Sequence, residues 1–430
     1  MTESSQFHAA EHLLSRRTFL GGLAVAGAGM IGLAGQVQSA AAEQIKSTGK
    51  RVLLLFQHGG VSQFESWDPK PNTEFGGPFK SISTSIPGVS VSELLPYTSR
   101  QTHHLSILRG LSTEDALHDS ARVRMITGRS QGFVGGQYPS FGAMCGKLLG
   151  TGRTQPAYVK LTDRAAWHLA PLVDASFLGP EYAPVVAFDE SPPDHLIRPA
   201  DLDEERASRL DSLRKRANDH FARQRKSDET SAYELSFDKA RQVMQQKEMF
   251  DLARESAADR ARYGCHAFGQ RCLLARRLLE QDCTFVKLNH LNYDSHFENF
   301  DNHLRLLGEF DRPFATLLED LQQRGMLETT LVIVMGEFGR TPKVNSSIGR
   351  DHWAKSWSMA LGGCGIKPGI VHGSTNAAGT EVVDGQVTAF DLFHTFYRAL
   401  GLDPNEHIYN GDQPLTLTET SGKPIKEILV

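Results

Sequence analysis

A continuous apolar run from Leu331 to Met335 constrains the fold of this chain more than any other feature. A strand without polar alternation is buried on both faces, as in parallel sheets that are covered by helices on each side. Similar runs occupy Arg51 to Phe56 and Thr284 to Leu288, and segments with helical periodicity alternate with them. The alternation predicts an α/β fold with a mostly parallel central sheet between helical layers.

The segment that follows this run is dense in charged residues. They are Glu337, directly after the strand, and then Arg340, Lys343, Arg350, Asp351 and His352. In open α/β sheets, ligands bind outside the carboxyl ends of the strands. We therefore predict a functional site here; the alternative is a surface loop with solvated charges.

The N-terminus has the pattern of an export signal. Arg16 and Arg17 precede an apolar, Gly/Ala-rich run from Gly21 to Gly35, and small residues follow at Ala40 to Ala42. These are the parts of a signal peptide, and the paired arginines indicate twin-arginine export. The apolar run is shorter than the roughly 20 residues that cross a bilayer, which favours cleavage over a membrane anchor. We predict a signal peptide over residues 1–42, a periplasmic or otherwise exported protein, the twin-arginine export machinery as a partner, and no stable membrane span after cleavage.

The remaining residues, 43–430, are interpreted as a single domain with a helical insertion at about 200–280. The insertion is rich in Arg, Lys, Glu and Asp, with apolar residues such as Leu210, Leu213 and Phe221 at helical spacing. We expect two or three helices that pack on the sheet, with a lid over the site as the alternative.

Composition narrows the classes of partner. The formal net charge is −4 and no basic block stands out, which argues against nucleic acid as the main partner. The five cysteines include three in one helical region, Cys265, Cys272 and Cys283, where an oxidising compartment would permit a bridge. No C-x-x-C pattern occurs, so packing is their expected role.

Four predicted strand ends supply groups that could bind a metal. They are His58; His118 with Asp119; Asp294 with His296; and Glu337 with Asp351 and His352. Imidazole and carboxylate are ligands of zinc, manganese and iron, so the repetition predicts a divalent metal whose identity stays open. For any single one of these residues, a core or capping role is the alternative.

Four motifs in combination resemble a known family. They are H-G-G-V-S-Q-F-E-S-W-D-P-K-P at 58–71, D-S-H-F-E-N-F at 294–300, G-E-F-G-R-T-P-K at 336–343 and G-R-D-H-W at 349–353. The chain resembles the twin-arginine-exported family called domain of unknown function 1501, which is similar to sulfatases and belongs to the alkaline-phosphatase-like superfamily. The resemblance spans nearly all of residues 43–430. It implies an alkaline-phosphatase-like fold with a metal site at the strand ends.

The same resemblance implies a set of metal ligands. Asp294 and His296 are similar to the Asp/His pair of one metal subsite, and His352 to the later histidine that completes it. Glu337 falls where the superfamily places an Asp-His pair, and His58 follows the first strand, which normally ends in aspartate. The predicted metal ligands are His58, Asp294, His296, Glu337 and His352.

Two substitutions separate this chain from ordinary sulfatases. The segment from His118 to Arg129 resembles the helix that bears the sulfatase nucleophile, and the position of that cysteine falls at His118. An oxidised-cysteine nucleophile is therefore excluded there, and His118 is expected to act as a general base, a covalent nucleophile or a further ligand. The second substitution is Phe338, which lies at a position where the resemblance implies a metal ligand.

Together these observations predict an exported metal-dependent hydrolase of phosphate, sulfate or related esters, without a cysteine-derived nucleophile. The substrate would be an anionic ester, and Arg340, Lys343 and Arg350 would bind the anion. The alternative is a non-catalytic binding or assembly protein that retains the alkaline-phosphatase-like fold, because such a protein would show substituted ligands.

Overall fold

The structure is a computed structural model that describes residues 49–130, 137–150, 155–164, 174–188, 193, 196, 202–224 and 228–430. The predicted signal peptide, residues 1–42, lies outside these ranges. Within them, no helix has both the length and the apolar character that crossing a membrane requires.

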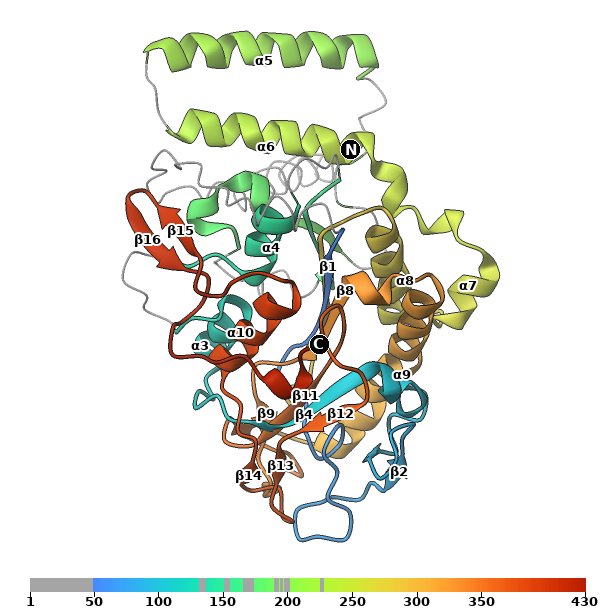
Figure 1. Cartoon of the computed structure of the whole chain (residues 1–430). Coiled ribbons are helices and arrows are strands. Elements are labelled where there is room, and N and C mark those ends of the chain that lie inside the picture. The colour runs from blue at the N-terminus through green and yellow to red at the C-terminus, as the bar shows by residue number, and fades with distance from the viewer. Residues whose placement is uncertain are drawn as a thin grey trace.

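An eight-stranded sheet forms the centre of the molecule (Figure 1). Its strand order is β12-β4-β11-β8-β1-β7-β5-β6. Only β11 runs antiparallel to its neighbours, so the predicted mostly parallel sheet is confirmed. The strands are β1 (Arg51–Gln57), β4 (Leu105–Leu111), β5 (Tyr158–Thr162), β6 (Val185–Phe188), β7 (Phe285–His290), β8 (Thr330–Met335), β11 (Trp357–Gly363) and β12 (Ile370–His372).

Helices and short ribbons surround this sheet. The α-helices are α3 (His118–Thr127), α4 (Phe141–Leu149), α5 (Glu204–Gln224), α6 (Asp228–Gln245), α7 (Ala257–Arg262), α8 (Ala267–Glu280), α9 (Asn299–Gln323) and α10 (Ala389–Ala399). Two-stranded ribbons pair β2 (Ser81–Ser83) with β3 (Ser90–Ser92), β9 (Gly339–Arg340) with β10 (His352–Trp353), β13 (Ser374–Thr375) with β14 (Val382–Asp384), and β15 (His407–Asn410) with β16 (Gln413–Thr416). Short 3-10 helices are η2 (Thr98–His104), η4 (Ser176–Leu178), η5 (Pro180–Tyr182), η6 (Lys247–Phe250), η7 (Leu252–Arg254), η8 (Leu327–Thr329) and η9 (Lys426–Ile428).

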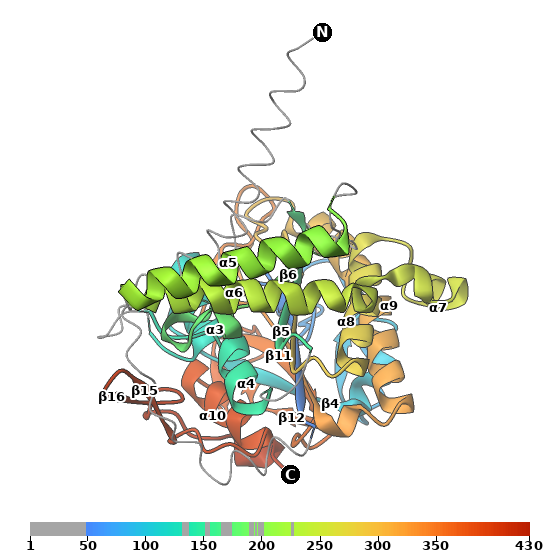
Figure 2. The same cartoon turned by 90° about the horizontal axis from the view of Figure 1, so that it is seen from above.

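The two faces of the sheet bury separate hydrophobic cores. Along β1, Val52, Leu54 and Phe56 enter one core, whereas Leu53 and Leu55 enter the other. The first core is covered by α3, α4 and α10, and the second by α8 and α9 (Figures 1 and 2). The central strands are buried on both sides, which explains their uninterrupted apolar sequences.

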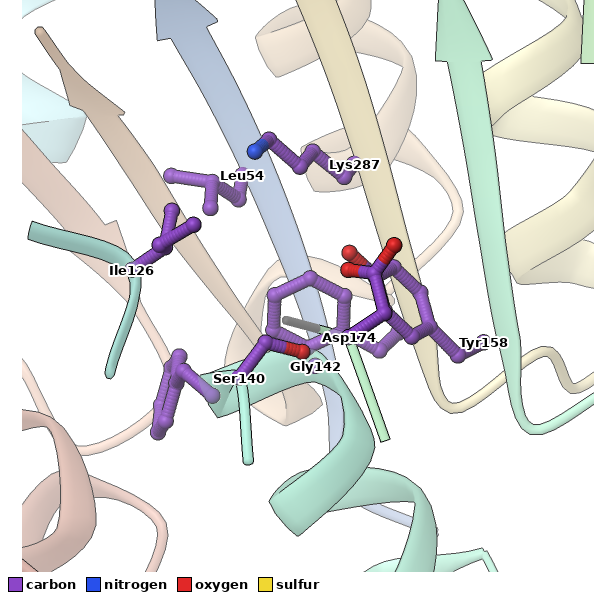
Figure 3. Close-up of a pocket in the computed structure, with 9 residues that line it drawn as sticks. Leu54, Ile126, Ser140, Gly142, Tyr158, Asp174 and Lys287 are labelled. Atoms are coloured by element: carbon purple, nitrogen blue, oxygen red, sulfur yellow. The ribbon is translucent and has the colours of Figure 1, made fainter. Parts of the chain in front are cut away.

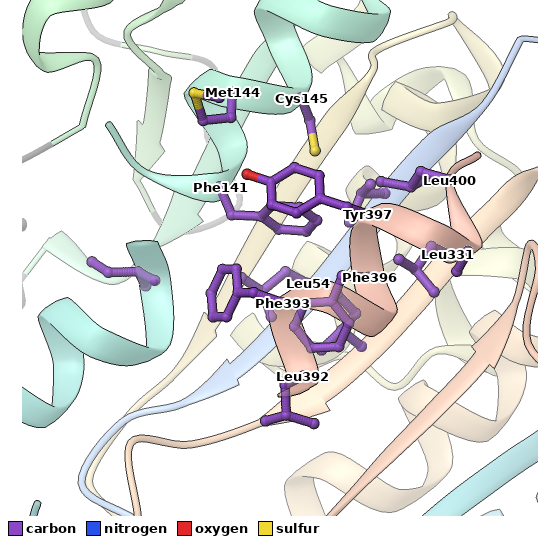
Figure 4. Close-up of a cluster of buried hydrophobic side chains, with 14 of the residues drawn as sticks. Leu54, Phe141, Met144, Cys145, Leu331, Leu392, Phe393, Phe396, Tyr397 and Leu400 are labelled. Atoms are coloured by element: carbon purple, nitrogen blue, oxygen red, sulfur yellow. The ribbon is translucent and has the colours of Figure 1, made fainter. Parts of the chain in front are cut away.

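Aromatic rings fill much of the core under α4 and α10 (Figure 4). Phe141 lies with its ring centroid 5.6 Å from those of Phe393 and Phe396. The helix that presents these last two rings begins with a capping box, in which Thr388 and Asp391 each accept from the other's backbone N–H. The packing fixes the layer that backs the sheet.

Helices α5 and α6 lie side by side at one end of the molecule (Figures 1 and 2). Lys239 anchors α6, because its ammonium group donates to the carbonyl of Glu181 at 3.0 Å. Leu210, Leu213 and Phe221 on α5 are exposed. The pair lies at the opposite end from β9, so the structure gives no support to a lid over the predicted site.

Disulfides do not join the five cysteines, all of which lie in described residues. Only Cys265 is exposed. The other four are buried in the two cores or against them, consistent with a packing role.

Candidate metal centre

Four of the predicted site segments meet at one edge of the sheet. Strands β1, β7 and β8 are parallel neighbours, and β4 points the same way because β4 and β8 are both antiparallel to β11. The carboxyl ends of β1, β7, β8 and β4 lead to His58, Asp294, Glu337 and His118, respectively. The topology therefore explains how residues far apart in sequence share one site.

Glycines allow these segments to touch through their backbones. Gly59 has a φ of +106°, and a Cβ atom there would lie 2.3 Å from the backbone nitrogen of Asp294. At Gly349, a Cβ atom would lie 1.9 Å from the carbonyl oxygen of His296. In the H-G-G and G-R-D-H-W motifs, glycine is thus required because the backbone of the D-S-H segment leaves no room for a side chain.

The carboxylate of Asp294 contacts three imidazoles. His118 Nε2 lies 3.1 Å from Oδ2, and His296 Nε2 and His352 Nε2 each lie 3.1 Å from Oδ1. The two Nε2 atoms of His296 and His352 are 3.0 Å apart. Among the described residues, His118, Asp294 and His352 form the one group whose ligand atoms all lie within 4.8 Å of one another, and His296 adjoins it.

Each imidazole uses its other nitrogen, Nδ1, to contact an oxygen atom. The partners are Glu337 Oε1 for His118 at 2.9 Å, Asp351 Oδ1 for His296 at 2.6 Å, and the carbonyl oxygen of Ala116 for His352 at 2.8 Å. Metal-binding histidines are typically oriented in this way by a carboxylate or carbonyl. A carbonyl only accepts hydrogen bonds, so Nδ1 of His352 is protonated; in the neutral ring, Nε2 then presents a lone pair that a metal could use.

This arrangement fits a cation. If Asp351 likewise accepts from Nδ1 of His296, then two imidazole lone pairs and Asp294 Oδ1 form a triangle of electron-pair donors with sides of 3.0 to 3.1 Å. These three atoms repel one another unless a proton or a metal lies between them. Donor separations in a tetrahedral site with bonds of about 2.0–2.1 Å are only slightly longer, roughly 3.3 Å. Imidazoles with one carboxylate suit zinc, and also manganese or iron.

Without a metal, hydrogen bonds shift the protonation of this cluster. His118 makes one hydrogen bond to Asp294 and another, with a smaller effect, to Glu337. Together they raise the pKa of His118 to about 9. Burial alone would raise the pKa of Asp294, but hydrogen bonds from His118, His352 and Arg340 hold it well below its usual range. Desolvation alone would raise the pKa of the buried Glu337, but the hydrogen bond from His118, together with the charges of His58, His118 and Arg122, lowers it. His118 therefore remains a candidate ligand or proton carrier.

Arg340 does not occupy the expected position for binding a substrate anion. Its side chain is fully buried, and Nη2 lies 2.6 Å from Asp294 Oδ1. The same Nη2 also donates to the carbonyl of Gly59, and Nε and Nη1 donate to the carbonyls of Gly60 and Arg350. The guanidinium has no free edge, so it holds the carboxylate of Asp294 instead.

The other two predicted anion-binding residues also lie elsewhere. Arg350 is fully buried; it pairs with Glu65 at 3.1 Å and donates to three backbone carbonyls. Lys343 is exposed and forms no contact with the cluster. The sequence could not reveal this burial, because Glu65 is 285 positions from Arg350.

Two of the predicted metal ligands lie outside the donor group. Glu337 contacts Nδ1 of His118, where it orients that imidazole. His58 is buried beside it, and burial, followed by the charge of Lys287, lowers the pKa of His58 to about 3. Lys287 also lines a water-sized cavity of about 10 Å³ with Tyr158 and Asp174 (Figure 3). The charged group of Lys287 is thus buried close enough to His58 to affect its pKa.

Arg122 is a candidate site residue that sequence reasoning missed. It lies one helical turn beyond His118 on α3, and its charge lowers the pKa of Glu337. Its side chain is 14% exposed, and its ion-pair partner Asp119 is 4.0 Å away and 92% exposed. A loosely paired guanidinium beside the centre can bind an anion. The i, i+4 spacing from His118 was the available signal.

Comparisons with known proteins yield one family and several distant structures. The family model described as "Protein of unknown function (DUF1501)" matches residues 49–429. No curated protein matches the chain.

Solved structures that are similar to this chain at low identity include hydrolases and a synthase. The lipoteichoic acid synthase LtaP from Listeria monocytogenes is 9% identical, with 91% of this chain and 80% of that chain covered and a TM-score of 0.38. The PsFucS1 sulfatase from Pseudoalteromonas sp. is 13% identical, with 85% and 72% covered and a TM-score of 0.39. The phosphonate monoester hydrolase SpPMH from Silicibacter pomeroyi is 13% identical, with 88% and 76% covered and a TM-score of 0.38.

Proposed function

This chain belongs to the family described as "Protein of unknown function (DUF1501)", and from that premise we propose that it is an exported, metal-dependent hydrolase of phosphate, sulfate or related esters. One observation supports the proposal above all others. Three imidazoles converge on the carboxylate of Asp294, and each is held at Nδ1 by an oxygen acceptor. Such a donor set serves little purpose without a cation.

In this proposal, the metal ligands are Asp294, His118, His296 and His352. Zinc, manganese or iron bound there would polarise an ester oxygen or activate water. Asp351 and the carbonyl of Ala116 orient His296 and His352, and Glu337 orients His118.

Two arginines have different roles in the proposed site. Arg340 fixes Asp294, so it is a positioning residue. Arg122 binds the anionic group of the ester, because its guanidinium is only weakly paired. Among the described residues, the donor group contains imidazoles and a carboxylate and no thiol, which favours hydrolysis without a cysteine-derived nucleophile.

The first test is the metal content of the purified protein. We expect about one equivalent of a transition metal by elemental analysis, and hydrolysis within a panel of aryl phosphates, sulfates and phosphonates. His352→Ala should lower both, whereas the control His407→Ala, at an exposed histidine on β15, should change neither. A metal-free protein that hydrolyses none of these esters would refute the proposal, and unchanged metal occupancy in His352→Ala would refute the ligand set.

A non-catalytic, metal-binding protein is the second candidate. Phe338 favours it, because its ring lies 4.4 Å from that of His352 and 5.0 Å from that of His118, at the place where a further ligand was expected. Stoichiometric metal without hydrolysis of any ester in the panel would support this function over the first.

Export by the twin-arginine pathway is part of the same proposal, and the supporting observation is the Arg16-Arg17 pair before an apolar run. The double variant Arg16→Lys, Arg17→Lys should remain in the cytoplasm. Fractionation that finds this variant exported as efficiently as the wild type would contradict the proposal.

A further inference from the structure

A pocket separate from the metal centre lies at the same edge of the sheet, beside α8 and α9. Its volume is about 270 Å³. Asp163 follows β5 and His290 ends β7, so both lie at the carboxyl ends of parallel strands, as Asp294 does. The polar residues that line the pocket are Asp163, His266, Arg271, His290, Asn292 and Glu309.

The orientation and protonation of His290 follow from its neighbours. Its ring stacks on Phe268 at a centroid distance of 4.1 Å. The amide of Gln57 donates to the hydroxyl oxygen of Tyr293 at 3.1 Å, so that hydroxyl donates its own proton to Nδ1 of His290, 2.9 Å away. Burial lowers the pKa of His290, which keeps the ring neutral. Its Nε2 is consequently an N–H donor.

This N–H group has no hydrogen-bond partner within the described part of the chain. His290 is 3% exposed, and the nearest carboxylate oxygen, Oε2 of Glu309, is 3.5 Å away. Arg271 presents a second donor of this kind. Its side chain is 3% exposed, one Nη atom pairs with Asp163, and its Nε has no hydrogen-bond partner among the described residues. Buried donors without partners are rare in folded proteins and point to a bound molecule or water.

The pocket therefore combines donors and acceptors of both charges. Arg271 is positive, whereas Asp163 and Glu309 are negative, and Glu309 is shared with Arg305 at 3.1 Å. A bound anion would be repelled by the two carboxylates, and a bound cation would be repelled by the guanidinium. A hydroxyl group both donates and accepts, so a molecule with several hydroxyls satisfies every one of these groups.

We propose that this pocket binds a neutral sugar ring. Its volume is slightly below the roughly 300–1,000 Å³ of pockets that hold drug-sized ligands, which suits a single ring. The ring hydroxyls accept from His290 and Arg271 and donate to the carboxylate of Glu309.

The location of the pocket relates the sugar to the metal centre. Asn292 lines the pocket and Asp294 is only two residues further, so their Cα atoms are at most about 7 Å apart. The chain turns at Asn292, which has a φ of +74° and accepts from Asn302 at 2.8 Å. If the chain has the proposed hydrolase function, on which this step rests, the sugar is the alcohol part of the ester. The substrate is then a sugar sulfate or a sugar phosphate.

The test is direct binding, without any need for hydrolysis. A panel of methyl glycosides of common hexoses and deoxyhexoses is added to chelator-treated full-length protein, and binding is measured by saturation-transfer NMR and calorimetry. We expect at least one glycoside to bind. Glu309→Gln should weaken that binding about tenfold or more, because a hydrogen bond to a charged group is lost. His290→Phe, which keeps the ring stack and removes the N–H group, should also weaken it.

Glu319→Gln is the matched control. Glu319 lies on the same helix, its side chain is 45% exposed against 38% for Glu309, and it too pairs with an arginine, Arg262, at 3.2 Å. The inference is overturned if no glycoside binds, or if Glu309→Gln and His290→Phe bind as tightly as the Glu319→Gln control. Ester hydrolysis without glycoside binding would refute this inference alone, whereas glycoside binding without metal or hydrolysis would refute the proposed function alone.

Discussion

Replacing Asp351 by Asn isolates the contribution of one oxygen acceptor to metal affinity. Oδ1 of Asp351 lies 2.6 Å from Nδ1 of His296, and this hydrogen bond is the main reason that the pKa of Asp351 is lowered. The substitution preserves size and removes the charge that orients the imidazole and strengthens its basicity.

The expected loss can be bounded from known outer-shell effects. Changes to partners of metal-binding histidines typically cost about 10–100-fold in affinity, or about 1.4–2.8 kcal/mol. The side chain of Asp351 is 53% exposed, so solvent screens its charge and we expect a value near the lower end, about tenfold.

Competition with a chromophoric zinc chelator measures this change. Asp403→Asn is the control, because the side chain of Asp403 is also 53% exposed and pairs with a cation, Arg398, at 3.1 Å. Thermal unfolding of the metal-free variants checks that both are folded. Equal zinc affinity in the two variants would show that His296 is not a ligand held by Asp351, and the reasoning would fail.

Four further outcomes follow from the geometry. In metal-free protein, NMR titration should place the pKa of His118 near 9, and Glu337→Gln should lower it. Because this pKa is raised from 6.5, the stabilisation that it provides is complete below about pH 6.5 and is lost as the pH rises through 9. Thermal unfolding of Glu337→Gln should show a smaller decline, because the hydrogen bond from His118 to Asp294 remains. Gly59→Ala should destabilise the fold by at least about 2 kcal/mol and reduce metal binding, whereas Gly308→Ala, on α9 with open space around it, should stabilise by about 0.5–1 kcal/mol in denaturant unfolding. Arg350→Met should cost about 3–5 kcal/mol because it leaves Glu65 buried without its partner; a stable variant with a raised KM would instead restore Arg350 as a substrate-binding residue.

Periodicity was sufficient to locate the elements that position the site. The run from Leu331 to Met335 lies in β8, and the run from Arg51 to Phe56 lies in β1. The segment from His118 to Arg129, which the family resemblance placed on a helix, corresponds to α3, which ends at Thr127. The two strands have strong patterns because their burial is set by layers that extend over the whole sheet.

Side-chain direction was beyond sequence reasoning once a strand had ended. Glu337 and His352 both lie near the predicted place, but spacing could not show that Glu337 faces Nδ1 of His118 while His352 reaches Asp294 directly. Arg340 is satisfied by carbonyls about 280 positions away, and no local pattern records such partners. The charge-dense loop was interpreted as a functional site in which Arg340 and Arg350 bind an anion, whereas the carbonyls of remote turns allow both guanidinium groups to be buried.

The sequence distances within the centre also govern how the molecule folds. His118 and Glu337 are 219 positions apart, and His352 and Asp294 are 58 apart. Contacts of such long range form only after the strands between them have assembled, so the centre closes late and tends to slow folding. A bound cation would then act on global opening and not on local fraying, protecting distant segments such as α10 and β1 from proteolysis together.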